Sequence, residues 1–253
     1  MSEFDAGARL QLSLFAKSPA YLLLLISVPF FGAIFLSVEH YAHDPAVVPQ
    51  AILAPALMGV WIIAVALADM IIFMERGYGT LEFIAAAPAS PSRLIAGRVA
   101  AITLVGLAVI PEALLVARAG FGDSLTIFHP GVFVLALLAN AVATAATALA
   151  MTALFLAFRS VSRYVNALGY PFYILGGVIL PARYLPAWIR PVSDVIYLHW
   201  TSALMYASAS RAPVPGVPRS LVAVAVLAAA SFAAGHWLLS RAVARLRENG
   251  RLS

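Results

Sequence analysis

Long apolar runs separated by short polar segments dominate this chain. Six runs predict membrane-crossing helices, at about 20–38, 51–74, 94–116, 131–158, from about 164 onward, and 220–240. Most of these runs reach the ~20 residues with which an α-helix crosses a bilayer. The fifth is weakened by glycine and proline between 169 and 177. The pattern predicts an all-α integral membrane protein with about six transmembrane helices, forming a single transmembrane domain over 1–253.

Two further segments are expected to lie at the membrane without crossing it. Residues 1–18 place leucines, Phe15, Arg9 and Lys17 in a pattern typical of a helix on the membrane surface. Residues 181–219 are broken by prolines and rich in Trp and Tyr, which favour the membrane interface. Irregular backbone at membrane depth persists only where protein or water surrounds it. We therefore expect an N-terminal interfacial helix, and re-entrant outer helices between spans five and six.

The composition supports this class and excludes several others. Hydrophobic residues make up 63% of the chain, charged residues make up 11%, and the mean hydropathy is +0.95. A soluble domain has about 25% charged residues. The chain has no cysteine, which excludes disulfides and Cys-based metal sites. The net charge of +5 comes mostly from arginines at span ends, so it is not a nucleic-acid signal.

The distribution of basic residues predicts that both termini are cytoplasmic, in the cell (inner or plasma) membrane. In that orientation eleven of the sixteen basic residues lie inside: Arg9, Lys17, Arg76, Arg93, Arg98, Arg159, Arg163, Arg241, Arg245, Arg247 and Arg251. The other five lie outside: Arg118, Arg183, Arg190, Arg211 and Arg219. Such an inside excess is what the orientation rule requires.

The polar segment from Glu75 to Arg93 separates spans two and three on the predicted cytoplasmic side. Gly77 and Gly79 allow a sharp turn after the second span. The next residues, 80–87, predict a short helix with an acidic first turn that prolines then end. A polar connector would show similar features, so the pattern alone leaves its role open.

The residue string of this segment resembles the intracellular segment of ABC type-2 exporter permeases, which carries their coupling helix. The matching residues are Glu75-Arg76, then Gly79-Thr80-Leu81-Glu82, a proline-containing stretch, and Arg93. The outer segment is similar to the same family through Gly176, Gly177, Pro181, Leu185, Pro186 and Trp188. It departs from the family at Leu198-His199-Trp200-Thr201, where many members have a Pro-Leu-Thr-Tyr-like string.

The resemblance implies a permease subunit that moves an amphipathic substrate (a drug, antibiotic, lipid or glycan-lipid) outward. It implies a separate ATP-binding-cassette subunit, a second permease copy in a homo- or heterodimer, and the lipid bilayer as partners. ATP and Mg would be bound by the partner subunit, and this chain would bind no cofactor. The residues implied in partner coupling are Glu75, Arg76, Gly79, Thr80, Leu81, Glu82 and Phe83.

A second candidate group lies in the fourth span. Asn140, Thr144, Thr147 and Met151 follow each other at helical spacing and share one face. Small, weakly polar residues on one face usually indicate close helix packing in membranes. A substrate path or a dimer seam is the alternative interpretation of this face.

Missing motifs limit the other functional classes. The only lysine, Lys17, follows Ala16, so the chain has no Walker A motif with which to bind ATP itself. It also lacks HExxH and Gly-x-Ser-x-Gly. Two alternatives remain open: a proton-driven secondary transporter that uses Asp69, and a membrane-embedded lipid-modifying enzyme that uses Asp69, Glu112 or histidines as acid and base.

Overall fold

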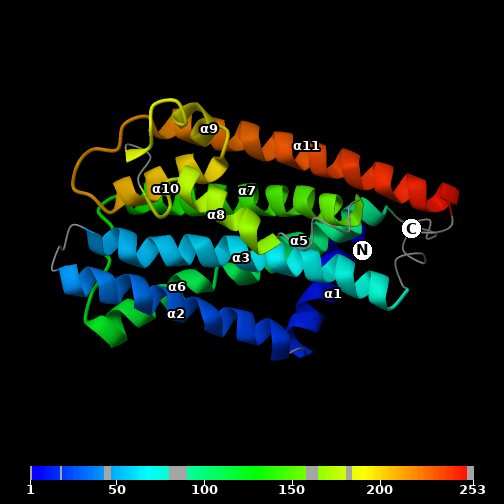
Figure 1. The fold of residues 1–253 in the computed structure, drawn as a ribbon, viewed down its shortest axis with the longest axis horizontal. Helices are drawn as coiled ribbons and strands as arrows, with labels where there is room; N and C mark the ends of the chain where they lie inside the picture. The colour runs from blue at the N-terminus through cyan, green and yellow to red at the C-terminus, as the bar shows by residue number, and fades with distance from the viewer. Residues whose placement is uncertain are drawn as a thin grey trace.

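The structure is a computed structural model that describes residues 2–17, 19–42, 47–79, 90–157, 165–180 and 184–249. All regular secondary structure in these residues is helical (Figure 1). The helices, in chain order, are α1 (Glu3–Lys17), α2 (Pro19–Ala42), α3 (Val48–Gly77), α5 (Pro91–Gly106), α6 (Val109–Val116), the π-helical turn η2 (Ala117–Phe121), α7 (Pro130–Ala157), α8 (Val165–Leu175), α9 (Arg190–Asp194), α10 (Tyr197–Ser208) and α11 (Val217–Asn249).

Four described helical segments are long and apolar enough to cross a membrane: α3, the run from Pro91 to Phe121, α7 and α11. In addition, α2 covers the predicted first span over 24 residues. The described part of the predicted fifth span, α8, has 11 residues, fewer than the ~20 that a bilayer requires. The last helix begins before the predicted sixth span and continues past it, so that Arg241 and Arg245 are helical. These helices make the chain a multi-pass membrane protein.

The long helices form a bundle whose two ends differ (Figure 1). Both termini lie at one end, with the last turn of α3 and the first turn of α5; we call this the terminal end. The short helices α9 and α10 lie toward the opposite end, which we call the far end. The predicted interfacial segment forms α1, which lies at the terminal end and packs on α5.

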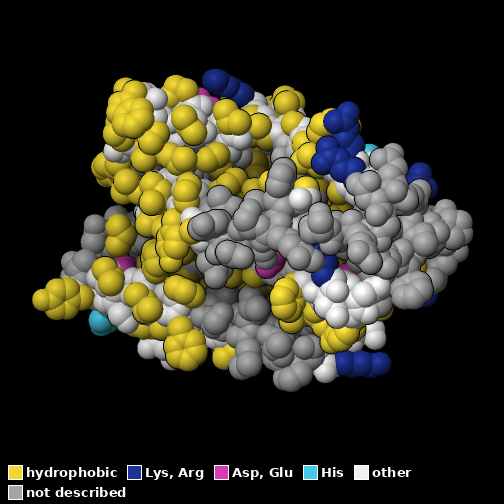
Figure 2. All heavy atoms as spheres, turned by 45° about the vertical axis from the view of Figure 1, so that its right-hand side comes forward, with side chains coloured by type: hydrophobic (Ala, Val, Ile, Leu, Met, Phe, Trp, Pro, Cys, Tyr) yellow, Lys and Arg dark blue, Asp and Glu magenta, His cyan; other side chains and the backbone are white. Residues whose placement is uncertain are grey.

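The centre of the bundle is α3, which packs against α2, α5, α6, α7 and α8. Its side chains are buried on nearly every face, and Ile63 and Leu67 have no exposed surface. In contrast, α11 packs mainly on α7 and keeps Val222 and Val226 more than 60% exposed. Hydrophobic side chains cover much of the described surface, as expected of a protein whose surroundings are lipid (Figure 2).

The predicted outer segment is ordered by hydrogen bonds around the end of α8. The helix stops at Leu175, and its following carbonyls accept side-chain donors from elsewhere. The hydroxyl of Ser202 donates to the carbonyl of Gly176 at 2.8 Å, and that of Tyr206 donates to Val178 at 2.7 Å. Because free carbonyls are costly away from water, these bonds allow irregular backbone to remain packed against α10.

The first prediction concerns the contact between α3 and the junction of α5 with α6. Ile63 packs here, and a Cβ atom on Gly106 would lie 3.4 Å from its Cγ2 atom. We expect Ile63→Ala to lower the free energy of unfolding by about 2 kcal/mol or more, because the buried site cannot collapse around the lost atoms. Thermal unfolding in detergent measures this loss. The matched control is Leu104→Ala, at a position that is 65% exposed, which should change stability by no more than about 0.5 kcal/mol.

Candidate functional site

The candidate site is the terminal end, where α3 and α5 flank the predicted coupling segment. Helix α3 ends at Gly77. Gly79 then adopts a φ of 67°, which turns the chain out of the helix as predicted. Helix α5 begins at Pro91, and proline is a favoured first residue for a helix. Residues 80–89 lie outside the described residues, so the structure gives the two flanks of the predicted coupling helix.

A buried ion pair joins these two flanks. The guanidinium of Arg98, in α5, donates to the carboxylate of Glu75, in the last turn of α3, at 2.5 Å. The Arg98 side chain is 3% exposed and that of Glu75 is 16% exposed. A second guanidinium N–H donates to the side-chain oxygen of Gln11, in α1, at 3.0 Å. One arginine therefore connects three helices, and the charge-assisted bonds that it makes are stronger than neutral ones.

Helix α1, which covers this ion pair, packs so closely on α5 that the two backbones are almost in contact. A Cβ atom on Gly7 would lie 2.1 Å from the carbonyl oxygen of Leu94, and one on Gly97 would lie 2.1 Å from that of Phe4. Real Cβ atoms do not approach oxygen so closely. Both positions therefore require glycine, as do other close helix contacts in membranes.

The start of α1 is fixed by a capping box. The Asp5 amide donates to the Ser2 hydroxyl at 3.2 Å, and the Ser2 amide donates to the Asp5 carboxylate at the same distance. The Ser2 hydroxyl also donates to this carboxylate, and these bonds hold the pKa of Asp5 below its ordinary value. Beside it, Glu3 accepts the amide N–H of Ser90, directly before α5, at 2.9 Å. The N-terminal helix is thus attached to both the first turn and the middle of α5.

The structure describes three of the seven predicted coupling residues. Glu75 lies in the ion pair with Arg98, and the guanidinium of Arg76 donates to the carbonyl of Leu156 in α7 at 2.6 Å. Gly79 makes the turn. The other four, Thr80, Leu81, Glu82 and Phe83, lie outside the described residues. Sequence reasoning missed Arg98 and Gln11, although a charge five residues into an apolar span is itself a signal of a special role.

The polar face of α7 lies against α10 in the structure. The hydroxyls of Thr144 and Tyr197 are 2.7 Å apart, and the hydroxyl of Thr201 donates to the side-chain oxygen of Asn140 at 3.0 Å. These four side chains are at most 3% exposed. Thr147 bonds to its own helix and Met151 is half-buried. The geometry of Asn140 and Thr144 therefore favours the helix-packing interpretation of this face.

Asp69 and Glu112, which the alternative functions invoke, lie at different depths. Asp69 is six residues before Glu75 in α3, and Glu112 is fourteen residues after Arg98. At 1.5 Å per residue these offsets place the two carboxyl groups about 12 Å apart along the bundle axis. The pair is therefore poorly placed to share one acid–base site.

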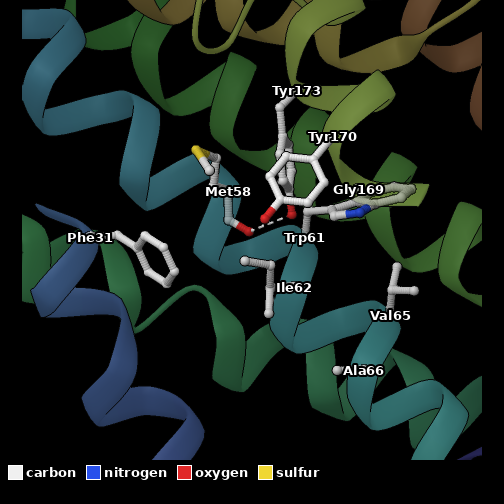
Figure 3. A pocket seen from close by; sticks show the side chains of 9 residues that line it. All are labelled: Phe31, Met58, Trp61, Ile62, Val65, Ala66, Gly169, Tyr170 and Tyr173. Carbon is white, nitrogen blue, oxygen red and sulfur yellow. Dashed lines mark hydrogen bonds between the residues drawn. The ribbon is translucent and has the colours of Figure 1, made fainter. Parts of the chain in front are cut away.

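An aromatic cavity lies at mid-height between α2, α3 and α8 (Figure 3). It has a volume of about 320 Å³ and is lined by Phe31, Met58, Trp61, Ile62, Val65, Ala66, Gly169, Tyr170 and Tyr173. The Tyr173 hydroxyl donates to the carbonyl of Met58 at 3.5 Å, which ties α8 to α3. The side chain of Tyr170 is 61% exposed, so this wall opens to the outside of the bundle. The sequence analysis did not identify this cavity.

The bundle of long apolar helices defines the class of protein as a multi-pass membrane protein. Comparison with known families identifies the particular family. The model of the ABC-2 type transporter family matches residues 9–208, most of the chain. The chain belongs to the ABC-2 type transporter family and is a transmembrane permease component of an ABC transporter. A comparison with curated proteins finds no match. The family implies an ATP-binding-cassette partner, as the sequence resemblance predicted.

The second prediction concerns the buried ion pair. We expect Arg98→Gln to lower the free energy of unfolding by about 3–5 kcal/mol, because it leaves the Glu75 carboxylate buried without its partner. The double variant Arg98→Met with Glu75→Gln should recover much of that loss, since it removes both charges. Thermal unfolding in nanodiscs compares the three proteins.

The matched control for this prediction is Arg93→Gln. The Arg93 side chain is 74% exposed and lies 4.0 Å from Glu3, so its loss should cost no more than about 1 kcal/mol. Equal destabilisation by Arg98→Gln and Arg93→Gln would show that the buried ion pair does not hold the terminal end together.

Proposed function

We propose that this permease component works as an exporter, moving an amphipathic substrate outward with ATP that a separate subunit hydrolyses. ATP and Mg belong to that subunit. Two permease chains pair, as a homo- or heterodimer, in the cell membrane. Each chain crosses the membrane about six times with both termini in the cytoplasm. The segment from Glu75 to Arg93 carries the coupling helix, at 80–87, which contacts the ATP-binding subunit.

The single observation that carries this proposal is the buried contact of Arg98 with Glu75 and Gln11. It joins the helix that enters the coupling segment, the helix that leaves it, and the N-terminal helix. An ion pair between α3 and α5 favours motion of these two flanking helices together. Nucleotide-driven motion of a docked partner would then reach α3 and α5 together, and would not be absorbed by a flexible loop.

The arrangement of the bundle supports the proposed orientation, in which both termini are cytoplasmic. Both termini and the last turn of α3, which contains Glu75, lie at the terminal end (Figure 1), and Glu75 is ion-paired with Arg98. This is the end to which the excess of basic residues was assigned, so one orientation places that excess and the coupling segment in the cytoplasm together. In this proposal Glu75 and Arg76 hold the turn at Gly79. The short helix begins at Thr80 and includes Glu82, and Leu81 and Phe83 insert into the partner.

The aromatic cavity supports an amphipathic substrate. Trp61 stacks on Phe172 at 4.5 Å between ring centroids and presents its other surface to the cavity beside Tyr170 and Tyr173 (Figure 3). Aromatic faces bind flat apolar groups, and also cations through the ring quadrupole. The tyrosine hydroxyls add a few polar groups to a mostly apolar wall, which is the usual composition of a small-molecule site.

The third prediction tests the partner. We expect an ATP-binding-cassette subunit to co-purify with this chain from detergent-solubilised native membrane and to hydrolyse ATP. Leu81→Asp should abolish the co-purification, because it places a charge in the apolar contact. The matched control is Val195→Asp, a change of the same type at a 69% exposed position at the far end, which should leave the complex intact. A chain that purifies folded but without an ATPase would contradict the exporter proposal.

The fourth prediction tests the cavity. We expect Tyr170→Ala to raise the concentration of a hydrophobic aromatic dye that gives half-maximal ATPase stimulation about tenfold, which corresponds to the loss of about 1.4 kcal/mol of binding. The folded structure should survive, since Tyr170 is largely exposed. Tyr41→Ala, at an 88% exposed position outside the cavity, is the control and should leave stimulation unchanged. Equal effects of the two changes would exclude this wall from substrate binding.

A further inference from the structure

A second hollow, distinct from the aromatic cavity, runs along the outside of the bundle toward the terminal end. We call it the alanine groove. Its volume is about 480 Å³, and α1, α5, α7 and α11 form its walls. Seven of its eleven lining residues are alanine: Ala96, Ala100, Ala145, Ala146, Ala225, Ala228 and Ala229. The other four are Phe4, Val142, Leu149 and Phe232, so the lining has no polar side chain.

The depth of the alanine groove can be read from α11. The guanidinium of Arg241 lies over the ring of Trp237, 4.3 Å from its centroid, and Trp with Arg is typical of the level of lipid headgroups. Phe232 is five residues before Trp237, or about 7.5 Å deeper, and Ala225 is about 10 Å deeper again. The part of the groove that α11 lines therefore lies about 7.5 to 18 Å below the headgroup level at the terminal end, a depth that one acyl chain spans in a core about 30 Å thick.

The end of the groove nearest the headgroups carries a positive charge. Arg93 lies one turn before Ala96 on the same face of α5 as Ala96 and Ala100, which line the groove. Its side chain is 74% exposed and approaches Glu3, the neighbour of the lining residue Phe4, only to 4.0 Å. An exposed guanidinium beside an apolar groove is complementary to a phosphate attached to a hydrocarbon chain.

We propose that the alanine groove binds a glycerophospholipid of the leaflet at the terminal end, with one acyl chain in the groove and the phosphate at Arg93. A second copy of this chain fits less well, because a protein interface here would desolvate the Arg93 guanidinium at the headgroup level. The bound acyl chain would touch Phe4, Ala96 and Ala100, beside the close contacts of Gly7 with Leu94 and of Gly97 with Phe4. It would thereby stabilise the packing of α1 on α5, which holds Arg98.

The experiment uses the full chain in nanodiscs that contain phosphatidylglycerol with a photoreactive diazirine in its acyl chain. Cross-linked peptides are identified by mass spectrometry. We expect cross-links concentrated on the groove faces of α5, α7 and α11. The double variant Ala145→Phe with Ala228→Phe, which fills the groove, should lower them about fivefold or more, and Arg93→Gln should lower them less. The matched control is Val226→Phe, on the same helix at a 62% exposed position outside the groove, which should leave them unchanged.

Three results would overturn the proposal. Cross-links spread evenly over the exposed face of α11 would show ordinary contact with bulk lipid. Unchanged labelling in the filled variant would show that the acyl chain lies elsewhere. Because the chain has no cysteine, Ala229→Cys gives a single reporter, and its cross-linking to a second copy by a short bismaleimide would show that protein covers the groove. All three readouts are independent of ATP, so they distinguish failure of this site from failure of the export proposal.

Discussion

The buried ion pair between Arg98 and Glu75 is the interaction on which the terminal end of this permease depends. Two charges removed from water are costly unless each is fully hydrogen-bonded. Here Gln11 supplies a further acceptor to the same guanidinium at 3.0 Å, and α1 covers it. The close contact of Gly7 with α5 is what allows that cover. The ion pair and the glycine contact are therefore parts of one packed unit at the terminal end.

The proposed transmission of motion from a docked partner to the membrane helices depends on this unit. A loop between two independently moving helices would dissipate any push from a partner. In the proposed mechanism, the ion pair between α3 and α5 makes a displacement of the segment between them move both helices together. One of them, α3, packs against most of the other helices and lines the aromatic cavity. A motion at the terminal end can thus change the shape of that cavity through packed helices alone.

The far end is built by a different principle. There the backbone is irregular after α8, and hydroxyl groups from α10 satisfy its carbonyls. On its other side α10 bonds to the polar face of α7 through Tyr197 and Thr201. Polar side chains here take the place of water as partners of the backbone carbonyls, beside buried apolar residues such as Leu198 and Met205. The bundle therefore has an ion pair at its terminal end, side-chain hydrogen bonds at its far end, and one apolar helix, α3, at its centre.

The sequence by itself determined the class of this protein and the positions of most helices. Apolar runs near bilayer length can only be satisfied as helices, because no other open backbone structure is stable in hydrocarbon. The string from Glu75 to Arg93, with its order of charged, glycine and proline residues, was enough to indicate the family that the family match then confirmed. The turn at Gly79 was also predictable, since a left-handed residue is a local property of the chain.

Only the tertiary structure decided which residues form the site. Glu75 and Arg98 are 23 residues apart and Gln11 is 87 residues from Arg98, so no local pattern pairs them. The same holds for the aromatic cavity, which α2, α3 and α8 form together. It holds again for Asn140 and Thr144, whose spacing favours helix packing but does not identify the partners on α10 that the structure gives them. Hydrophobic periodicity indicates whether a helix face is apolar or polar. Which helix meets that face depends on packing between distant segments, and only the folded bundle fixes this packing.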